Sequence, residues 1–169
     1  AEGATRHSLT AMAYTSQWHS TDQVPQRAID SGLIGRYGTI DPTDHGKTSR
    51  YSLSWQMLKP EDDGEWTASA YFIRSRLALF SNFTYYLDNP VDGDQFEQAE
   101  SRNVMGGSLS RLWKGSLGGL ASNTTLGAQW RRDSLSPVGL YTAKDGMRTG
   151  VTQESRVRQT GVGVFAQNE

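Results

Sequence analysis

The sequence contains no cysteine, so the chain can form neither a disulfide nor a thiolate metal site. It also contains no run close to the roughly 18 apolar residues that a transmembrane helix needs. Its net charge of −1 gives no strong field of either sign, so nucleic acid is not an expected partner. These absences do not exclude a membrane β-barrel, because transmembrane strands alternate apolar and polar residues and carry little hydropathy signal.

Aromatic and small polar residues are what the sequence has instead. Its 169 residues include five Trp, seven Tyr, five Phe and 18 Gly, although apolar residues of all kinds make up only 36%. This mixture suits β structure with one polar face. Apolar and polar residues alternate with a period of two, as where Ser52 and Ser54 separate Tyr51, Leu53 and Trp55. The alternation predicts six strands, at 6–18, 49–58, 66–87, 103–113, 120–131 and 160–166.

The connections between these strands alternate in length. Residues 59–65 and 114–119 form short turns, whereas 20–48, 88–101 and 133–154 are long. A meander joined in this order places every long loop at one end, which is typical of outer-membrane barrels with short periplasmic turns and long extracellular loops. We therefore expect an all-β fold, an antiparallel β-meander of about six long strands that forms an open segment of a transmembrane β-barrel.

The expected strand ends carry two further signals. Residues 66–87 would span about 70 Å if fully extended, well beyond a bilayer core of about 30 Å. A short helical turn is possible near 97–102. Trp55, Trp66 and Trp113 lie beside the two short turns, which favours a periplasmic aromatic girdle. The alternative is that these tryptophans close the rim of a soluble β-sandwich.

Several segments resemble the loops and strands of TonB-dependent outer-membrane receptors. They are WHSTDQVPQRAI at 18–29, GLIGRYG at 32–38, DPT at 41–43, SRYSLS at 49–54, SNFTYYL at 81–87, GDQFEQ at 93–98 and GVFAQ at 163–167. The first three are similar to an extracellular loop of that family and the fourth to the strand that descends from it. The next two are similar to the top of a hairpin, and the last to the start of another barrel strand.

The resemblance implies a role in transport across the bacterial outer membrane. Such a receptor takes up a ferric siderophore, a vitamin or a similar scarce nutrient with energy passed through TonB. Residues 1–169 would form part of its barrel domain, since a TonB box and a plug domain are not found in this sequence. The implied partners are outer-membrane lipid, a small nutrient chelate, and the TonB complex through an N-terminal region of the parent protein. No cofactor is implied.

Candidate ligand contacts come from the polar residues of the expected loops. Guanidinium groups can hold an anionic chelate through bidentate hydrogen bonds. The candidates are Gln23, Gln26, Arg27, Arg36 and Tyr37 in the first long loop, Arg131 at the top of one strand and Arg156 at the start of the next. The alternative reading gives these arginines to Arg–Asp pairs within loops and to anionic lipid headgroups.

The residues do not indicate an enzyme or a metal site. His7, His19 and His45 lack the spacing of a metal motif. The loop at 88–100 differs from a calcium-binding loop at Pro90 and Ala99. The sequence has no nucleophile elbow and no phosphate-binding loop. Two alternatives to the receptor remain, a passive outer-membrane channel or autotransporter barrel, and a soluble β-sandwich binding module.

Overall fold

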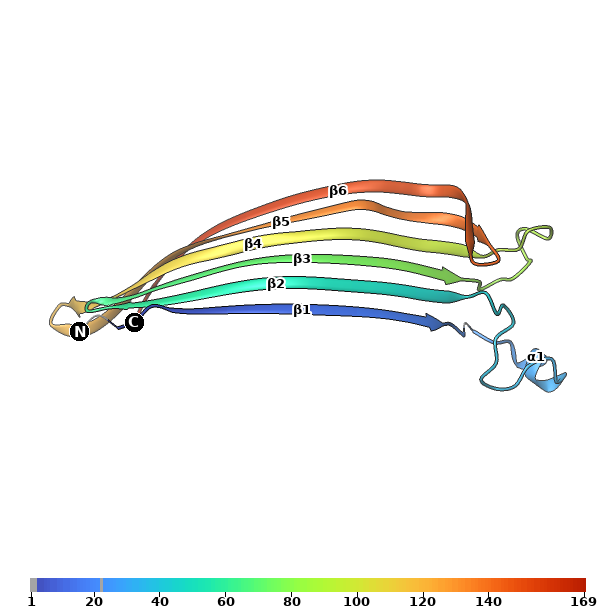
Figure 1. Ribbon diagram of the computed structural model, residues 1–169, viewed down its shortest axis with the longest axis horizontal. Coiled ribbons are helices and arrows are strands. Elements are labelled where there is room, and N and C mark those ends of the chain that lie inside the picture. The colour runs from blue at the N-terminus through green and yellow to red at the C-terminus, as the bar shows by residue number, and fades with distance from the viewer. Residues whose placement is uncertain (1–2, 22) are drawn as a thin grey trace.

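A computed structural model describes residues 3–21 and 23–169. These residues form one six-stranded antiparallel sheet in which each strand pairs with its neighbour in sequence (Figure 1). The strands are β1 (Arg6–His19), β2 (His45–Glu61), β3 (Gly64–Ser81), β4 (Phe96–Leu117), β5 (Leu120–Lys144) and β6 (Met147–Asn168). A short helix, α1 (Gln26–Asp30), lies between β1 and β2. The predicted all-β antiparallel meander of six long strands is confirmed, and the sheet is open, with β1 and β6 at its edges.

Two tight turns define one end of the sheet, here called the short-turn end. Register pairs Glu61 with Gly64 and Leu117 with Leu120, so each hairpin closes over two residues. Gly64 has a φ of +155°, and a Cβ at this position would lie 1.8 Å from the main-chain oxygen of Leu112, so no other residue fits. The start of β1 and the end of β6 lie at the short-turn end, while α1 and the longer connections lie at the opposite end (Figure 1).

The third connection corrects the sequence prediction. Residues 133–154 were expected to form a long loop, but β5 and β6 continue through this stretch and meet at a turn of only two residues. The turn residues Asp145 and Gly146 have φ values of +52° and +72°, the conformation that Asp-Gly adopts in two-residue hairpins. The strict alternation of short and long connections is therefore wrong at its last step.

Three smaller predictions also change. The strand expected at 66–87 ends at Ser81, because the amide side chain of Asn82 accepts a hydrogen bond from the backbone of Tyr85 at 2.8 Å and begins a turn. The helical turn expected near 97–102 is instead part of β4. Helix α1 was not expected, and it is anchored by one buried side chain, Ala28.

The two faces of the sheet differ in how crowded they are. Between residues 69 and 76 of β3, half-buried side chains such as Tyr71 and Ile73 alternate with exposed ones such as Phe72 and Arg74. Side chains converge on the concave side of a curved sheet and diverge on the convex side. We therefore call the face of Tyr71 the inner face and the face of Phe72 the outer face.

In the part of the sheet nearest the short-turn end, cross-strand register places most of the large apolar side chains on the outer face. We call this set the apolar band: Leu9 and Ala11 of β1; Leu53, Trp55 and Met57 of β2; Ala68, Ala70 and Phe72 of β3; Met105 and Leu109 of β4; Leu126, Ala128 and Trp130 of β5; and Val162, Val164 and Ala166 of β6. In the described residues no second layer of sheet covers it. Leu109, at its middle, is 49% exposed.

The inner face at the same depth is mainly polar. Its residues include Ser8, Thr10, Ser52, Ser54, Gln56, Thr67, Ser69, Ser108, Ser110, Thr125, Gln129, Gly161 and Gly163. The apolar exceptions include Met12, Leu58, Tyr71, Ile73, Val104 and Phe165. Hydroxyls pair across strands here, as between Ser69 and Ser108 at 2.7 Å. The chain therefore builds one apolar and one polar surface from the period-two alternation of its strands.

Arg111 lies among the apolar side chains of the outer face near the short-turn end, on the same cross-strand row as Trp66 and Lys59. Its guanidinium pairs with Glu61 and with Asp63 (2.8 Å) across the turn between β2 and β3. It also lies 5.0 Å from the ring of Trp66 and 5.3 Å from the ring of Trp113, within cation–π range. This placement explains a residue that interrupts the apolar pattern, since the side chain finds carboxylates and aromatic rings at the edge of the band.

Candidate functional site at the loop end

The end of the sheet opposite the short turns is here called the loop end, and three connections meet there. They are residues 20–44, residues 82–95 and the Asp145–Gly146 turn. Tyr85, whose φ is +62°, donates its hydroxyl to the main-chain oxygen of Gln23 at 3.0 Å and so ties the second connection to the first. The strands bring these segments together, because β2, β3, β4 and β5 pair in order and end at similar levels.

Gln95 joins the three connections. Its amide nitrogen donates to Thr43 Oγ1 at 2.8 Å and to Asp44 Oδ1 at 2.9 Å, both at the end of the first connection. Its amide oxygen accepts a hydrogen bond from the backbone of Gly146 at 2.8 Å. Gln95 and Asp44 are both buried. Because the buried amide uses both its donor and its acceptor, it fixes the relative positions of the loops.

Asp41 forms a second link in the same place. Its carboxylate accepts hydrogen bonds from the backbone and hydroxyl of Thr43, at 2.9 and 2.5 Å, and from the amide of Asn82 at 2.9 Å. Burial alone would raise the pKa of Asp41, but these hydrogen bonds stabilise the carboxylate and together lower its pKa below the ordinary value. Asp41 is therefore a structural acceptor, already engaged by the protein.

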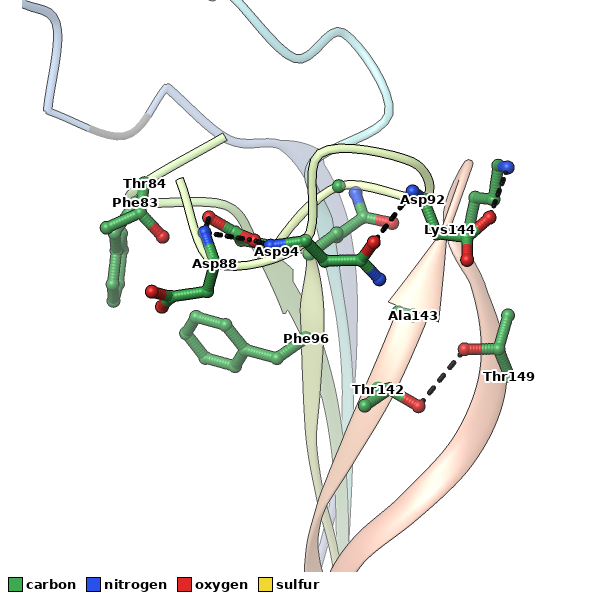
Figure 2. A pocket seen from close by; sticks show the side chains of 13 residues that line it. Phe83, Thr84, Asp88, Asp92, Asp94, Phe96, Thr142, Ala143, Lys144 and Thr149 are labelled. Carbon is green, nitrogen blue, oxygen red and sulfur yellow. Dashed lines mark hydrogen bonds and ion pairs between the residues drawn. The ribbon is translucent and has the colours of Figure 1, made fainter. Parts of the chain in front are cut away.

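Asp94 organises the tip of the second connection. Its carboxylate accepts hydrogen bonds from the backbone N–H groups of Leu87 (2.8 Å), Asp88 (3.1 Å) and Asn89 (2.7 Å). Burial raises its pKa, and the hydrogen bonds from Thr84 and from the backbone outweigh that effect and lower it. The carboxylate thus closes the loop on itself, and Figure 2 shows Asp94 at the centre of this arrangement.

A hollow of about 630 Å³ lies between this loop and the β5–β6 hairpin (Figure 2). Its lining is formed by Phe83, Thr84, Asp88, Asn89, Asp92, Gly93, Asp94, Gln95, Phe96, Thr142, Ala143, Lys144 and Thr149. Lys144 closes one side by pairing with Asp92 at 2.8 Å. The volume is in the range of small-molecule sites. Asp92 is paired with Lys144 and Asp94 with the loop backbone, so Asp88 is the lining carboxylate that has no hydrogen-bond or ion-pair partner among the described residues.

The five candidate contacts predicted in the first long loop lie in the first connection but do not line this hollow. Gln26 donates its side-chain amide to Asp30 at 2.8 Å within α1, and Gln23 contributes its main-chain oxygen to Tyr85. Arg27 and Arg36 are exposed, and Tyr37 is 88% exposed. These side chains are accessible, but the structure does not gather them into one site.

The two candidates predicted on strands lie elsewhere. Arg131 is in β5 on the inner face, well before the strand reaches the loop end, and it pairs with Asp133 through two hydrogen bonds of 2.7 and 2.9 Å. It lines a hollow of about 480 Å³ together with Ser69, Tyr71 and Gln129. Arg156 is within β6 on the outer face, by alternation from Arg158. The predicted placement at a strand top or start is wrong for both, because the strands continue further than the alternation indicated.

Sequence reasoning did not identify Gln95, Asp94 or Lys144 as organising residues. The Asp-Gly pair at 145–146 could have placed Lys144 beside a tight hairpin. Gln95 gave no comparable signal, because its partners Thr43 and Gly146 are each about fifty residues away in sequence. A residue whose role depends on such distant partners cannot be recognised from local pattern.

The described part of the chain contains no group of three or more His, Asp or Glu side chains placed to hold a metal ion. Within residues 3–21 and 23–169, no helix has both the length and the apolar character to cross a membrane. No protein-family model, no curated protein and no solved structure matches the chain. The resemblance to TonB-dependent receptors therefore stays a prediction from the sequence.

Proposed function

We propose that this chain forms six strands and the connecting loops of the barrel wall of a TonB-dependent receptor in the bacterial outer membrane. In this role the outer face contacts lipid and the inner face lines the lumen. The loop end faces the exterior and contributes to capture of a ferric siderophore, a vitamin or a similar nutrient. TonB would supply energy through parts of the receptor that this sequence does not include.

The apolar band is the observation that carries the proposal. On β4 the outer face is largely apolar from Met105 to Trp113, which is nine residues, and a tilted transmembrane strand needs about 9–11. Trp66 and Trp113 lie on the outer face at the short-turn border of the band, as expected for residues at a membrane interface. The polar inner face at the same depth suits a water-filled lumen.

A single open sheet also favours the barrel over the soluble alternative. A β-sandwich covers the apolar face of one sheet with a second sheet about 10 Å away, and the described residues contain one sheet only. In a barrel, lipid covers that face, and the strand edges of β1 and β6 pair with further strands. About 22 strands close a receptor barrel, so this chain would provide part of the wall.

Residue-by-residue labelling tests the membrane role. The chain has no cysteine, so a single introduced cysteine gives a unique fluorophore site. Leu109→Cys and Ser108→Cys are adjacent in β4 but lie on opposite faces. In the full chain folded into vesicles with brominated acyl chains, the fluorescence of the label at 109 should be quenched and that of the label at 108 should not. Equal quenching at both positions would overturn the membrane-wall proposal.

Energy dependence tests the transport role and separates the receptor from a passive channel. Cells that carry the complete parent gene should accumulate a ferric chelate or vitamin only when the TonB system is intact. Uptake that continues at the same rate after removal of TonB would favour a passive channel and contradict the receptor. The labelling result would stand in either case, because a passive barrel presents the same apolar face to lipid.

A further inference from the structure

Six basic side chains gather on the outer face beside the apolar band, on its loop-end side. They are Lys47, Arg74, Arg76, Arg132, Arg156 and Arg158, here called the basic cluster. All six are exposed. They come from β2, β3, β5 and β6, which are separate in sequence and are brought together only by the register of the sheet.

Register gives the cluster its shape. Arg74 and Arg158 lie on one cross-strand row, joined through Asn103 of β4 and Ser134 of β5. Three strand spacings of about 4.8 Å separate them, or about 14 Å. Arg132 lies one row nearer the short-turn end, on the row of Phe72 and Met105 at the edge of the apolar band, and Arg76 lies one row further from the band than Arg74. The cluster is therefore a patch that follows the border of the band.

Most of the cluster lies away from carboxylates. The rows of Arg132, Arg74 and Arg76 carry no Asp or Glu on the outer face of the described strands. The row of Lys47 carries Glu154, whose carboxylate accepts a hydrogen bond from the hydroxyl of Tyr141 at 2.8 Å. Arg74, Arg76, Arg132 and Arg158 are four positive charges with no carboxylate among them, so they repel one another and attract anions from outside.

Two consecutive arginines of β5 differ in whether their guanidinium groups are paired. Arg131 faces inward and is held by both oxygens of Asp133, whereas Arg132 faces outward and has no ion pair or side-chain hydrogen bond in the described structure. Arg74 and Arg76 likewise have none, and with Ser49 and Tyr51 they line a surface hollow of about 310 Å³. A tyrosine hydroxyl and two guanidinium forks around a hollow are suitable donors for a phosphate group.

We propose that the basic cluster is a binding site for the phosphate groups of an anionic lipid whose acyl chains lie on the apolar band. The inference rests on the proposed membrane role, since the band defines where the acyl chains are. The border position then places the guanidinium groups at headgroup depth, where basic residues bind anionic lipid. The hollow at Arg74 and Arg76 receives one phosphate, while Arg132 and Arg158 bind another.

Local lipid composition provides the test. A fluorophore on Ser101→Cys, which lies beside Arg76 on the outer face, reports the lipids at the cluster. The full chain is folded into phosphatidylcholine vesicles that contain a small fraction of brominated lipid, either phosphatidylglycerol or phosphatidylcholine. Because each basic residue near a surface favours anionic lipid about fivefold, we expect brominated phosphatidylglycerol to quench at least about threefold more than brominated phosphatidylcholine. The preference should fall in high salt.

Charge-matched variants separate the cluster from general attraction. Arg74→Gln with Arg132→Gln removes two charges from the cluster, and Arg6→Gln with Arg50→Gln removes two from the inner face. The first pair should bring the preference close to one, and the second should leave it unchanged. Equal effects of the two pairs would overturn the proposal. So would loss of the preference on adding millimolar inorganic phosphate, which would make the cluster a site for soluble anions.

Failure of this inference differs from failure of the membrane role. If the label at Leu109→Cys is quenched by brominated acyl chains but the label at Ser101→Cys shows no preference for phosphatidylglycerol, the band is in lipid and the phosphate site is wrong. If neither label is quenched, the chain is not in the membrane in the proposed orientation, and both proposals are contradicted.

Discussion

In the sheet, the surroundings of a side chain follow from whether its position in the strand is odd or even, whereas at the loop end they follow from individual partners. Leu109 and Ser108 are neighbours in sequence, yet register assigns one to the apolar band and the other to the polar inner face. Gln95, by contrast, is buried because Thr43, Asp44 and Gly146 meet its amide. The comparison shows that one protein can use a repeated pattern for its wall and specific contacts for its loops.

The largest expected effect comes from placing a charge on each face of the sheet. Leu109→Arg places a guanidinium at the middle of the apolar band, which costs about 2–4 kcal/mol when that face is in lipid. Ser108→Arg places the same group on the inner face, where we expect a cost below about 1 kcal/mol because lumen substitutions leave the charge in water. Urea titration of the chain folded into vesicles measures both free energies of unfolding.

This matched pair tests directly whether the face of the sheet on which a residue lies determines the environment of its side chain. If the two arginine variants have the same free energy of unfolding, the face of the sheet does not determine the environment of a side chain. In that case the distinction between the wall and the loop end would lose its basis. A larger cost for Ser108→Arg would reverse the assignment of the outer and inner faces.

The second prediction concerns the specific contacts of the loop end. Gln95→Ala removes the amide that bonds Thr43, Asp44 and Gly146, and it leaves buried polar groups without that partner. Loss of such buried hydrogen bonds costs about 1–3 kcal/mol. We expect the backbone N–H of Gly146 to exchange with solvent at least about tenfold faster, since 1.4 kcal/mol of local opening corresponds to that factor.

The control for this variant is a glutamine three residues further along the chain, in β4. Gln98→Ala removes an exposed side chain of β4, and hydrogen exchange at Gly146 should stay as in the unmodified chain. Exchange that is unchanged in Gln95→Ala as well would show that the backbone pairs of β5 and β6 hold the turn, and the role assigned to Gln95 would be wrong.

The same comparison explains which features the sequence could predict. The wall was predictable because alternation is local: Tyr51, Leu53 and Trp55 reveal their shared face within five residues. Six strands and their antiparallel order follow from that signal. The length of β5 and β6 did not follow, because polar residues near Arg131 and Arg156 obscured the alternation although the backbone continues to pair. Strand pairing, unlike alternation, depends on the neighbouring strand.

The loop end could be predicted only in part. Long connections were expected at 20–48 and 88–101, and the structure has long connections at 20–44 and 82–95. Their joint arrangement depends on Gln95 and Asp41, whose partners are distant in sequence. The predicted ligand contacts were chosen by chemical type alone. In the structure, Arg36 and Tyr37 lie on the surface of one loop, and Arg131 lies within strand β5. Chemical type selects candidates, but only contacts assemble a site.

The smallest expected effect is a dependence of the loop end on pH. The pKa of Asp41 is lowered in the folded chain because the hydrogen bonds from Thr43 and Asn82 outweigh the effect of burial. A lowered folded-state pKa means that this carboxylate stabilises the fold above its ordinary pKa of 3.8, and that the contribution is lost as the pH falls through the lower, folded-state value. Hydrogen exchange at the backbone of Thr43 should therefore indicate more frequent opening at acid pH below 3.8 than at pH 5, after correction for the intrinsic rate.

Asp41→Asn cannot titrate and should remove most of that difference, whereas sheet amides such as that of Leu109 should respond equally in both proteins. A pH response at Thr43 that survives in Asp41→Asn would assign the effect to another carboxylate of the loop end and would remove Asp41 from the contacts that hold it.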